Sequence, residues 1–381
     1  MAEPTLFLLT LFSLLAFSPL TSPRHLPPTF KTCTLNIASS LYPPSRSPSL
    51  TNQSQPRIHS PAKSSSLTLK IHSRDSLFSS DPHHAQTNYK SRLLARLARD
   101  SARVNSLQAR LDLAVLAYGD GSFTAGDFVT ETLTFSGAAA AVDNVAVGCG
   151  HSNEGLFIGA GGLLGLGGGA LSLPSQLNAT SFSYCLVDRD SDSASVLEFR
   201  PAESPSLNSV HSVSAQLIKN PQMDSFYYVG LTGIAVGGNP LELPAKAFQI
   251  DGDGNGGVIV DSGTAVTRLE SATYESLRDE FRRLTSHLAS AEGVAIFDTC
   301  YDLSGQTSVE VPEVELVFAS GKRLTLPAKN YMIPVDSEGT FCLAFAGTTS
   351  SMSIIGNVQQ QGTRVGFDLA NQVVTFEPNR C

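Results

Sequence analysis

The stretch Gly257-Val258-Ile259-Val260-Asp261-Ser262-Gly263-Thr264-Ala265 places a carboxylate at the end of three apolar, β-branched residues. Such an apolar run predicts a buried β-strand, and the Ser-Gly pair that follows predicts a turn. An aspartate at the end of a buried strand is unusual, because burying an unpaired charge is costly. A plain turn is the common explanation of Asp-Ser-Gly, but the strand before it and the second hydroxyl at Thr264 favour a functional Asp261.

The composition indicates a mostly β protein with a sizeable core. The 381 residues allow two domains or one large bilobed domain, and 41% of them are hydrophobic. The 31 glycines and 21 prolines are typical of a chain with many turns.

The net charge of −8 is unevenly distributed along the chain. Residues 1–117 contain 13 Lys or Arg and 5 Asp or Glu, whereas residues 118–381 contain 13 and 29. A basic leader therefore precedes an acidic body, which indicates either a nucleic-acid tail or a segment that docks on its own body. Few aromatic residues lie among the basic ones, so we expect no nucleic-acid partner.

The N-terminal residues resemble a secretory signal. The apolar run from Leu6 to Phe17 is too short to span a membrane and suits a signal peptide, although Glu3 and the lack of Lys or Arg make its start atypical. We predict a signal peptide over residues 1–22, secretion, and no membrane span elsewhere. The C-terminus carries no lipid-anchor or retention signal.

The leader has two parts. Residues 23–85 are rich in Ser, Pro and Thr, which predicts a disordered or processed segment. Residues 86–113 have leucines at helical spacing and arginines on the other faces, which predicts a basic amphipathic helix. This helix is either solvated, or packed on the acidic body as a pro-segment, or bound to a membrane surface.

The body has β texture from Tyr118 onward. Tyr118-Gly119-Asp120-Gly121-Ser122 predicts a turn, and the alternating Phe128–Phe135 predicts a half-buried strand of the same hairpin. Residues 201–222 are polar and indicate a linker between two lobes. A second β-rich block begins at Phe226, and its clearest helix is predicted over Ser271–Leu288.

Two motifs suggest ligands that we do not expect. Gly165-x-Gly167-x-x-Ala170 fits a relaxed dinucleotide pattern, but no βαβ unit surrounds it and no P-loop lysine follows. Asp251-x-Asp253-x-Asn255-Gly256 begins like a calcium loop, but its twelfth position is Ser262 instead of glutamate. Tight backbone packing and a solvated acidic turn explain them better, and we predict no cofactor and no metal.

Six cysteines and two sequons bear on secretion. The cysteines show no CxxC or Cys/His metal spacing and, in a secreted protein, favour disulfides; they are Cys33, Cys149, Cys185, Cys300, Cys342 and Cys381. Removal of the leader would leave five, so that one stays unpaired. Asn52 and Asn178 begin glycosylation sequons.

Several motifs together resemble a known family, the pepsin-like aspartic peptidases, and within it the plant nepenthesin-like and "aspartic protease in guard cell" group. The resemblance extends over Tyr118–Cys381 nearly throughout. The segments that carry it are Tyr118–Ser122, Leu163-Leu164-Gly165, Phe182-Ser183-Tyr184-Cys185-Leu186, Val258–Ala265, Phe297-Asp298-Thr299-Cys300-Tyr301, Ile354-Ile355-Gly356 and Gly356-Asn357-Val358-Gln359-Gln360.

The resemblance implies a mostly β, bilobed fold with a pseudo-twofold. The leader and pro-segment helix would occupy residues 23–113. An incomplete N-terminal lobe, which includes the flap, would occupy residues 114–210, and the C-terminal lobe would occupy residues 222–381. Each lobe should bring one Asp-Thr/Ser-Gly loop, beside which an apolar-apolar-Gly element passes.

The resemblance also assigns roles. Asp261 matches a catalytic aspartate, with Ser262, Gly263 and Thr264 supporting it, and Tyr118 matches the flap tyrosine, with Gly119, Asp120 and Gly121. Cys300–Cys342 and Cys185–Cys381 match family disulfides. It implies a monomeric zymogen that cleaves proteins or peptides at acidic pH and is sent to the apoplast or the vacuole.

The chemistry of the family needs two aspartates. Two adjacent carboxylates share one proton, because both cannot ionise cheaply. One then activates a water as a base, while the protonated one polarises the scissile carbonyl.

The sequence departs from this pattern, because Asp-Thr/Ser-Gly occurs only once, at Asp261. The end of the predicted helix at Leu111-Asp112-Leu113 is followed by only Ala114–Ala117 before Tyr118, where the family has a long segment with the first aspartate. We therefore hypothesise an internal deletion between about Asp112 and Tyr118, from splicing or a gene-model error, which would also remove the partner of Cys149.

Two other interpretations remain open. The chain is either a non-catalytic binding protein on the same scaffold, like the plant xylanase inhibitors, or a product that does not fold stably. The retained Asp261-Ser262-Gly263 argues mildly against a binding protein, because a binding scaffold does not need this motif. Lost strands, which would leave unpaired edges in the first lobe, favour the second.

Overall fold

The computed structural model describes residues 30–41, 67–71, 89–91, 93–94, 97–98, 116–117, 123–134, 141–154, 162–188, 191, 193–200 and 212–381. The chain divides into two units, Met1–Phe30 and Lys31–Cys381, and every element below belongs to the second. The predicted signal peptide lies outside the described residues.

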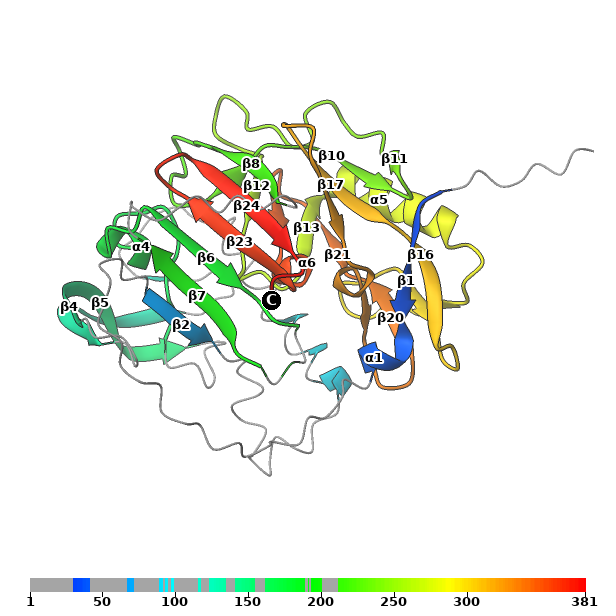
Figure 1. Cartoon of the computed structure of the whole chain (residues 1–381), viewed down its shortest axis with the longest axis horizontal. Helices are drawn as coiled ribbons and strands as arrows, with labels where there is room; N and C mark the ends of the chain where they lie inside the picture. Colours follow the sequence, from blue (N-terminus) through cyan, green and yellow to red (C-terminus); the bar gives the residue numbers. More distant parts are fainter. Residues whose placement is uncertain are drawn as a thin grey trace, which may run out of the picture. The chain divides into compact units, whose positions relative to one another are not determined.

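The fold is mostly β, as predicted, and its largest sheet contains the strand that precedes Asp261 (Figure 1). This sheet runs in the order β2 (Leu67–Ile71), β7 (Ser195–Arg200), β6 (Ser181–Cys185), β23 (Thr363–Asp368), β24 (Val373–Pro378), β8 (Val213–Ile218), β9 (Tyr228–Val229), β12 (Val258–Val260), β22 (Ser353–Ile355), β13 (Thr267–Glu270) and β21 (Phe345–Thr348).

Four smaller sheets complete the described strands. One has the order β11 (Asn239–Pro240), β10 (Leu231–Val236), β17 (Val314–Phe318) and β18 (Arg323–Leu326), and another has the order β14 (Ser290–Ala291), β15 (Cys300–Asp302), β20 (Thr340–Leu343) and β19 (Met332–Pro334). The third contains β3 (Leu116–Ala117), β4 (Phe123–Thr134) and β5 (Ala141–Glu154). The fourth pairs β1 (Thr32–Asn36) with β16 (Ser308–Pro312). The helices are α1 (Ile37–Leu41), α4 (Leu173–Gln176), α5 (Ser271–Leu284), α6 (Asn357–Gln360) and the 3-10 turn η1 (Ala328–Asn330).

The leader is more structured than the sequence predicts. The expectation that residues 23–85 lack regular structure is wrong for Thr32–Leu41, which forms β1 and α1, and for Leu67–Ile71, which forms β2 at the edge of the largest sheet. Both strands pair with the body, and Leu35 is only 1% exposed. Apolar residues at alternate positions gave these segments a face to bury despite their Ser- and Pro-rich surroundings.

The second half of the chain follows the predictions closely. Helix α5 begins at Ser271, where Glu270 caps its first amides, and ends at Leu284, one turn before the predicted end. The hydroxyl of Thr285 donates to Phe281 O at 2.7 Å, which satisfies a carbonyl of the last turn. Strand β8 lies inside the predicted linker 201–222, because alternate residues from Val213 onward are apolar and pair with β24.

Candidate active site

Asp261 follows strand β12 at the point where the chain leaves the largest sheet. The residues of β12 are at most 6% exposed, which confirms the predicted buried strand. Strand β22 lies between β12 and β13, parallel to the former and antiparallel to the latter. The Asp261 N–H donates to Ile355 O at 3.1 Å, so the end of β22 fixes the backbone of the aspartate.

Gly356 allows the two chain segments to cross. A Cβ atom at this position would lie 2.4 Å from the carbonyl carbon of Val266, so no side chain fits. The next amides bind the Asp261 loop directly, since Asn357 N–H donates to Thr264 O at 2.6 Å and Val358 N–H donates to Ala265 O at 2.9 Å. The apolar-apolar-Gly element therefore threads beside the loop, as the resemblance implies.

The carboxylate of Asp261 is oriented by its own loop. The Gly263 N–H donates to Oδ1 at 2.9 Å, and the Thr264 hydroxyl donates to Oδ2 at 2.7 Å. Thr264 is fully buried, whereas Asp261 and Ser262 are half-buried. These two donors hold the carboxylate in one position. The side-chain amide of Asn357 donates to Ser262 O at 2.9 Å and fixes the next residue of the loop.

Tyr184 approaches this loop from β6. Its hydroxyl donates to the side-chain oxygen of Gln360. Burial raises the pKa of Tyr184, the charge of Asp261 raises it further, and a hydrogen bond with Ser262 lowers it. The phenol thus stays neutral beside the aspartate. In the sequence, Tyr184 is visible only as part of a family motif, because its partners lie far along the chain.

Buried side-chain amides hydrogen-bond the chain segments around the crossing of β22 and the Asp261 loop. Gln359 Oε1 accepts from both the amide and the hydroxyl of Thr267 at 2.8 Å, and Gln359 Nε2 donates to Asn330 O and Ala344 O at 2.8 Å. Gln359 and Asn330 are at most 2% exposed. Buried polar side chains are nearly always hydrogen-bonded. Three consecutive glutamines after Val358 could therefore have indicated a buried hydrogen-bond network, which the sequence analysis did not predict.

The apolar-apolar-Gly element of the first lobe, Leu163-Leu164-Gly165, does not pass beside an aspartate loop in the described part of the chain. Leu163 and Leu164 are 60% and 51% exposed and lie outside any strand, whereas Ile354 and Ile355 are 0% and 2% exposed. A Cβ at Gly165 would meet no atom of the described residues within 4 Å. The first lobe thus retains its apolar-apolar-Gly element without the loop that such an element should cross.

The remaining predicted site residues are those of the flap, the two sequons and the cysteines. The flap residues Tyr118, Gly119, Asp120 and Gly121 and the sequon residue Asn52 lie outside the described residues. Asn178 is exposed. The disulfides Cys185–Cys381 and Cys300–Cys342 are both present, and Cys33 and Cys149 are the free thiols.

The predicted basic helix contacts the body near the candidate site. Its described residues, 89–91, 93–94 and 97–98, are helical. Leu93 and Leu97 are 4% and 2% exposed and pack in one cluster with Val266 and Val358, which flank the Asp261 crossing. This contact favours the docked pro-segment among the three interpretations of the helix.

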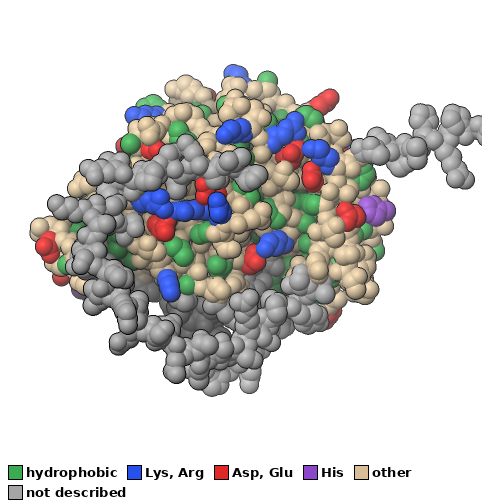
Figure 2. Space-filling model, in the orientation of Figure 1, with side chains coloured by type: hydrophobic (Ala, Val, Ile, Leu, Met, Phe, Trp, Pro, Cys, Tyr) green, Lys and Arg blue, Asp and Glu red, His purple; other side chains and the backbone are tan. Residues whose placement is uncertain are grey.

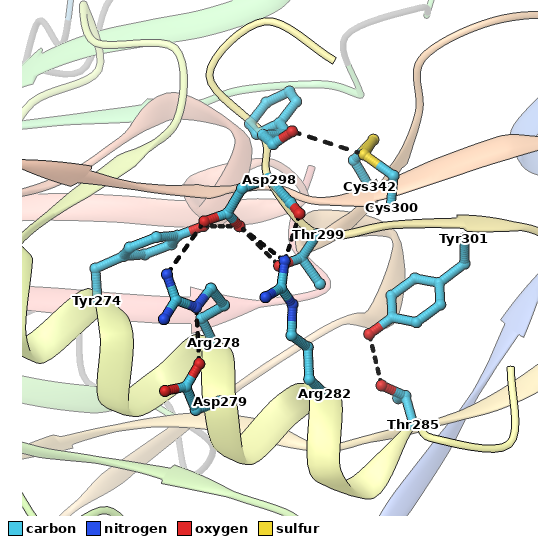
Figure 3. A network of polar contacts seen from close by, with 11 residues as sticks. Tyr274, Arg278, Asp279, Arg282, Thr285, Asp298, Thr299, Cys300, Tyr301 and Cys342 are labelled. Carbon is cyan, nitrogen blue, oxygen red and sulfur yellow. Dashed lines mark hydrogen bonds and ion pairs between the residues drawn. A yellow bond between two sulfur atoms is a disulfide. The ribbon is translucent and has the colours of Figure 1, made fainter. Parts of the chain in front are cut away.

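Asp298, which has no glycine two residues later, belongs to a structural network (Figure 3). Its carboxylate accepts from Tyr274 at 2.5 Å and Thr299 at 2.7 Å, and it pairs with Arg278 at 3.4 Å and Arg282 at 3.7 Å. This network ties α5 to the strand that carries Cys300 of a disulfide, and it gives Asp298-Thr299 a structural role without catalysis.

The calcium-like loop is closed by its own carboxylate. Asp251 Oδ1 accepts from the Asp253 and Asn255 amides at 2.9 and 2.8 Å, which shapes a turn. Within the described ranges, no group of three or more His, Cys, Asp or Glu side chains could hold a metal ion. In the same part of the chain, no helix has the length and apolar character needed to cross a membrane.

Surface charges are locally paired. On the face drawn in Figure 2, Lys and Arg side chains lie among Asp and Glu side chains. Examples are Arg364 with Glu198 and Lys329 with Asp188. A hollow of about 420 Å³ includes Arg364 and Ser183, but Ser183 points to the face of β6 opposite Tyr184, and Asp261 does not line it.

Comparisons with known proteins agree with this architecture. Family models described as "Xylanase inhibitor N-terminal" and "Xylanase inhibitor C-terminal" match residues 32–199 and 226–378, which together are well over half of the chain. Two solved structures, "edgp" and Basic 7S globulin from soybean, share the fold at TM-scores of 0.56 and 0.52, with 22% identity. These matches cover 68% and 62% of this chain and 70% and 64% of theirs.

Curated relatives are closer in sequence. The chain is 52% identical over 267 residues to Protein ASPARTIC PROTEASE IN GUARD CELL 2 of Arabidopsis thaliana, covering 69% of this chain and 56% of the relative. It is 51% identical over 289 residues to Aspartyl protease family protein 2 of the same plant, covering 74% and 58%. It is 40% identical over 273 residues to Aspartic proteinase nepenthesin-2 of Nepenthes gracilis, covering 69% and 60%.

The chain thus spans 56–60% of the length of these curated relatives. Its fold is the bilobed pepsin-like fold with an incomplete N-terminal lobe, because the second lobe has the complete loop crossing and the first lobe does not. The chain belongs to the pepsin-like aspartic peptidase family, among the plant members related to nepenthesins and the ASPARTIC PROTEASE IN GUARD CELL proteins.

Proposed function

We propose that the full-length form of this protein is an aspartic endopeptidase and that this chain has lost most or all of that activity. The observation that carries the proposal is the oriented carboxylate of Asp261, with hydrogen bonds from Gly263 and Thr264, in a sequence that lacks a second Asp-Thr/Ser-Gly motif. The names of the relatives support peptide-bond hydrolysis as the reaction of the family.

One carboxylate cannot fill both catalytic roles. The reaction needs a base that activates water and an acid that polarises the carbonyl at the same time. Asp261 supplies one of these groups, and its partner would come from the segment hypothesised to be missing between Asp112 and Tyr118. The exposed Leu163 and Leu164 support this deletion, as does the free, exposed Cys149.

We further propose that the full-length protein is a monomeric zymogen in the secretory pathway, active at acidic pH on protein or peptide substrates. Docking of Leu93 and Leu97 beside Val266 supports a pro-segment that restrains the site. The predicted leader at residues 1–22 and the exposed sequon at Asn178 support secretion to the apoplast or the vacuole.

A peptide-cleavage assay at acidic pH tests the catalytic proposal. This chain should cleave at least about 100-fold more slowly than a chain with the family's first-lobe segment restored, because general acid–base catalysis contributes that much or more. Asp261→Asn should abolish the activity of the restored chain. Robust turnover by this chain that depends on Asp261 would contradict the proposal, and the transcript across Asp112–Tyr118 tests the deletion itself.

A second candidate function is non-catalytic binding, which the lack of a second Asp-Thr/Ser-Gly motif in the sequence favours. The matching family models carry the name of xylanase inhibitors. A pull-down with glycanases discriminates between the two candidates. Specific retention of a glycanase by a chain without peptidase activity would support the binding function.

A further inference from the structure

Strand β16 depends on the N-terminal segment for its pairing. Among the described strands, its one partner is β1, antiparallel, with Thr32 opposite Pro312 and Asn36 opposite Ser308. Without β1, this edge of the C-terminal lobe would present a row of unpaired backbone groups. Such an edge is a ready template for another extended chain.

The side chains of β1 alternate between the lobe and the solvent. Leu35 of β1 and Ile37, the first residue of α1, are 1% and 2% exposed, whereas Thr32, Thr34 and Asn36 are exposed. Residues with this period of two fill separate pockets along a strand. The body beside β16 therefore encloses two alternate apolar side chains of this segment, as a groove for an extended peptide would.

Both ends of the segment are fixed by backbone hydrogen bonds. Lys31 N–H donates to Gly237 O at 2.8 Å, and Glu313 N–H donates to Lys31 O at 3.0 Å. At the other end, Ile37 N–H donates to Thr307 O at 3.1 Å, where α1 begins. The contact is thus continuous from Lys31 to Ile37.

Cys33 fills the third inward position. Its Sγ lies 2.8 Å from the hydroxyl of the fully buried Tyr331, which in turn donates to Pro312 O at 2.8 Å. Tyr331 thereby connects the inward face of β1 to the backbone of β16. The position admits a small side chain that can hydrogen-bond a phenol.

We propose that the edge of β16 is a binding groove for an extended peptide, that Lys31–Leu41 is its built-in ligand, and that this segment stays bound as a separate, non-covalent chain after the leader is cut. Strand addition explains the affinity through backbone hydrogen bonds and the specificity through pockets for alternate side chains. The proposal is independent of Asp261 and of peptidase activity.

A cleavable full-length chain tests retention. A recognition sequence for a site-specific protease is inserted between Leu41 and Leu67, the chain is cut, and the products are separated by size exclusion and weighed by mass spectrometry. The N-terminal peptide should elute with the body. Its quantitative separation from a folded body would overturn the proposal.

Peptide exchange tests the pockets. A labelled synthetic peptide of residues 31–41 should replace the cut segment, and the Leu35→Asp peptide should bind at least about 100-fold more weakly, because a carboxylate would enter an apolar pocket. The Thr32→Ala peptide is the matched control, since Thr32 is exposed, and should bind within about 3-fold of the native peptide. Equal binding of all three peptides would contradict a groove with specific pockets.

Crosslinking of the intact chain tests the register without any cut. Thr34 and Glu310 face each other at a pair that is not hydrogen-bonded, where Cα atoms approach closely enough for a disulfide. Thr34→Cys with Glu310→Cys should crosslink spontaneously, whereas Thr34→Cys with Ser308→Cys, a diagonal pair, should not. Crosslinking of the diagonal pair alone, or of neither pair, would disprove this docking of β1.

Discussion

At the residue scale, two glycines of equivalent sequence have opposite surroundings. A methyl group at Gly356 would clash with the Val266 backbone at 2.4 Å, whereas one at Gly165 would meet no atom of the described part of the chain within 4 Å. We predict that Gly356→Ala lowers the free energy of unfolding by at least about 2 kcal/mol, since backbone must move to admit it. Gly165→Ala is the matched control and should be nearly neutral. Urea denaturation measures both, and equal losses would contradict the asymmetry between the lobes.

Residue roles were predictable where they depend on local sequence. Asp261 and Thr264 were identified from one short motif, because their hydrogen bonds form within a single turn. Tyr184 and Gln359 were not identified as site residues, because their partners lie elsewhere in the chain. Without the fold, a buried amide or phenol is indistinguishable from an exposed one.

At the element scale, α5 is attached to the body through Asp298. Burial alone would raise the pKa of Asp298, but hydrogen bonds from Tyr274, Thr299 and Arg278 and the charge of Arg282 lower it below the ordinary value of 3.8. A lowered pKa adds stability that is present above the unfolded pKa and is lost as the pH falls through the folded pKa. The contribution of Asp298 to stability should therefore be present above about pH 4 and be lost as the pH falls below it.

We predict that Asp298→Asn lowers the urea midpoint at pH 5 and reduces its decline below pH 4, because the titrating partner of Arg278 is gone. Asp253→Asn, at an exposed turn, is the control and should leave the acid decline unchanged. The measurement is the urea midpoint as a function of pH. An acid decline of the same size in Asp298→Asn would show that other carboxylates cause it.

The elements also show the limits of sequence patterns. The apolar run of β12 and the spacing in α5 were sufficient for correct predictions, because each element buries one continuous face. Strand β1 was missed because it has only two inward residues, Cys33 and Leu35, in a segment whose composition indicates disorder. Its order comes from β16, a partner that the local sequence does not contain.

At the scale of the whole molecule, the two lobes differ in how much surface they bury. The hairpin of β4 and β5 is largely exposed, and Phe128 on it is 68% exposed. The second lobe buries Ile354, Ile355 and Thr264 at its crossing, and the Cys300–Cys342 disulfide links two of its strands. A two-stranded hairpin with little buried surface is marginally stable, which keeps the interpretation of an unstable first lobe open for experiment.

We therefore predict that amide hydrogens of β4 and β5 exchange at least about 100-fold faster than those of β12 and β22, because local opening needs little free energy where few apolar contacts are buried. Hydrogen–deuterium exchange with mass spectrometry compares both regions in one sample, so the second lobe is the internal control. Restoring the missing first-lobe segment should slow exchange in β4 and β5 and leave β12 unchanged. Equal protection of the two regions in this chain would mean that the shortened first lobe is stable by itself, and the deletion would then remove catalysis without removing the fold.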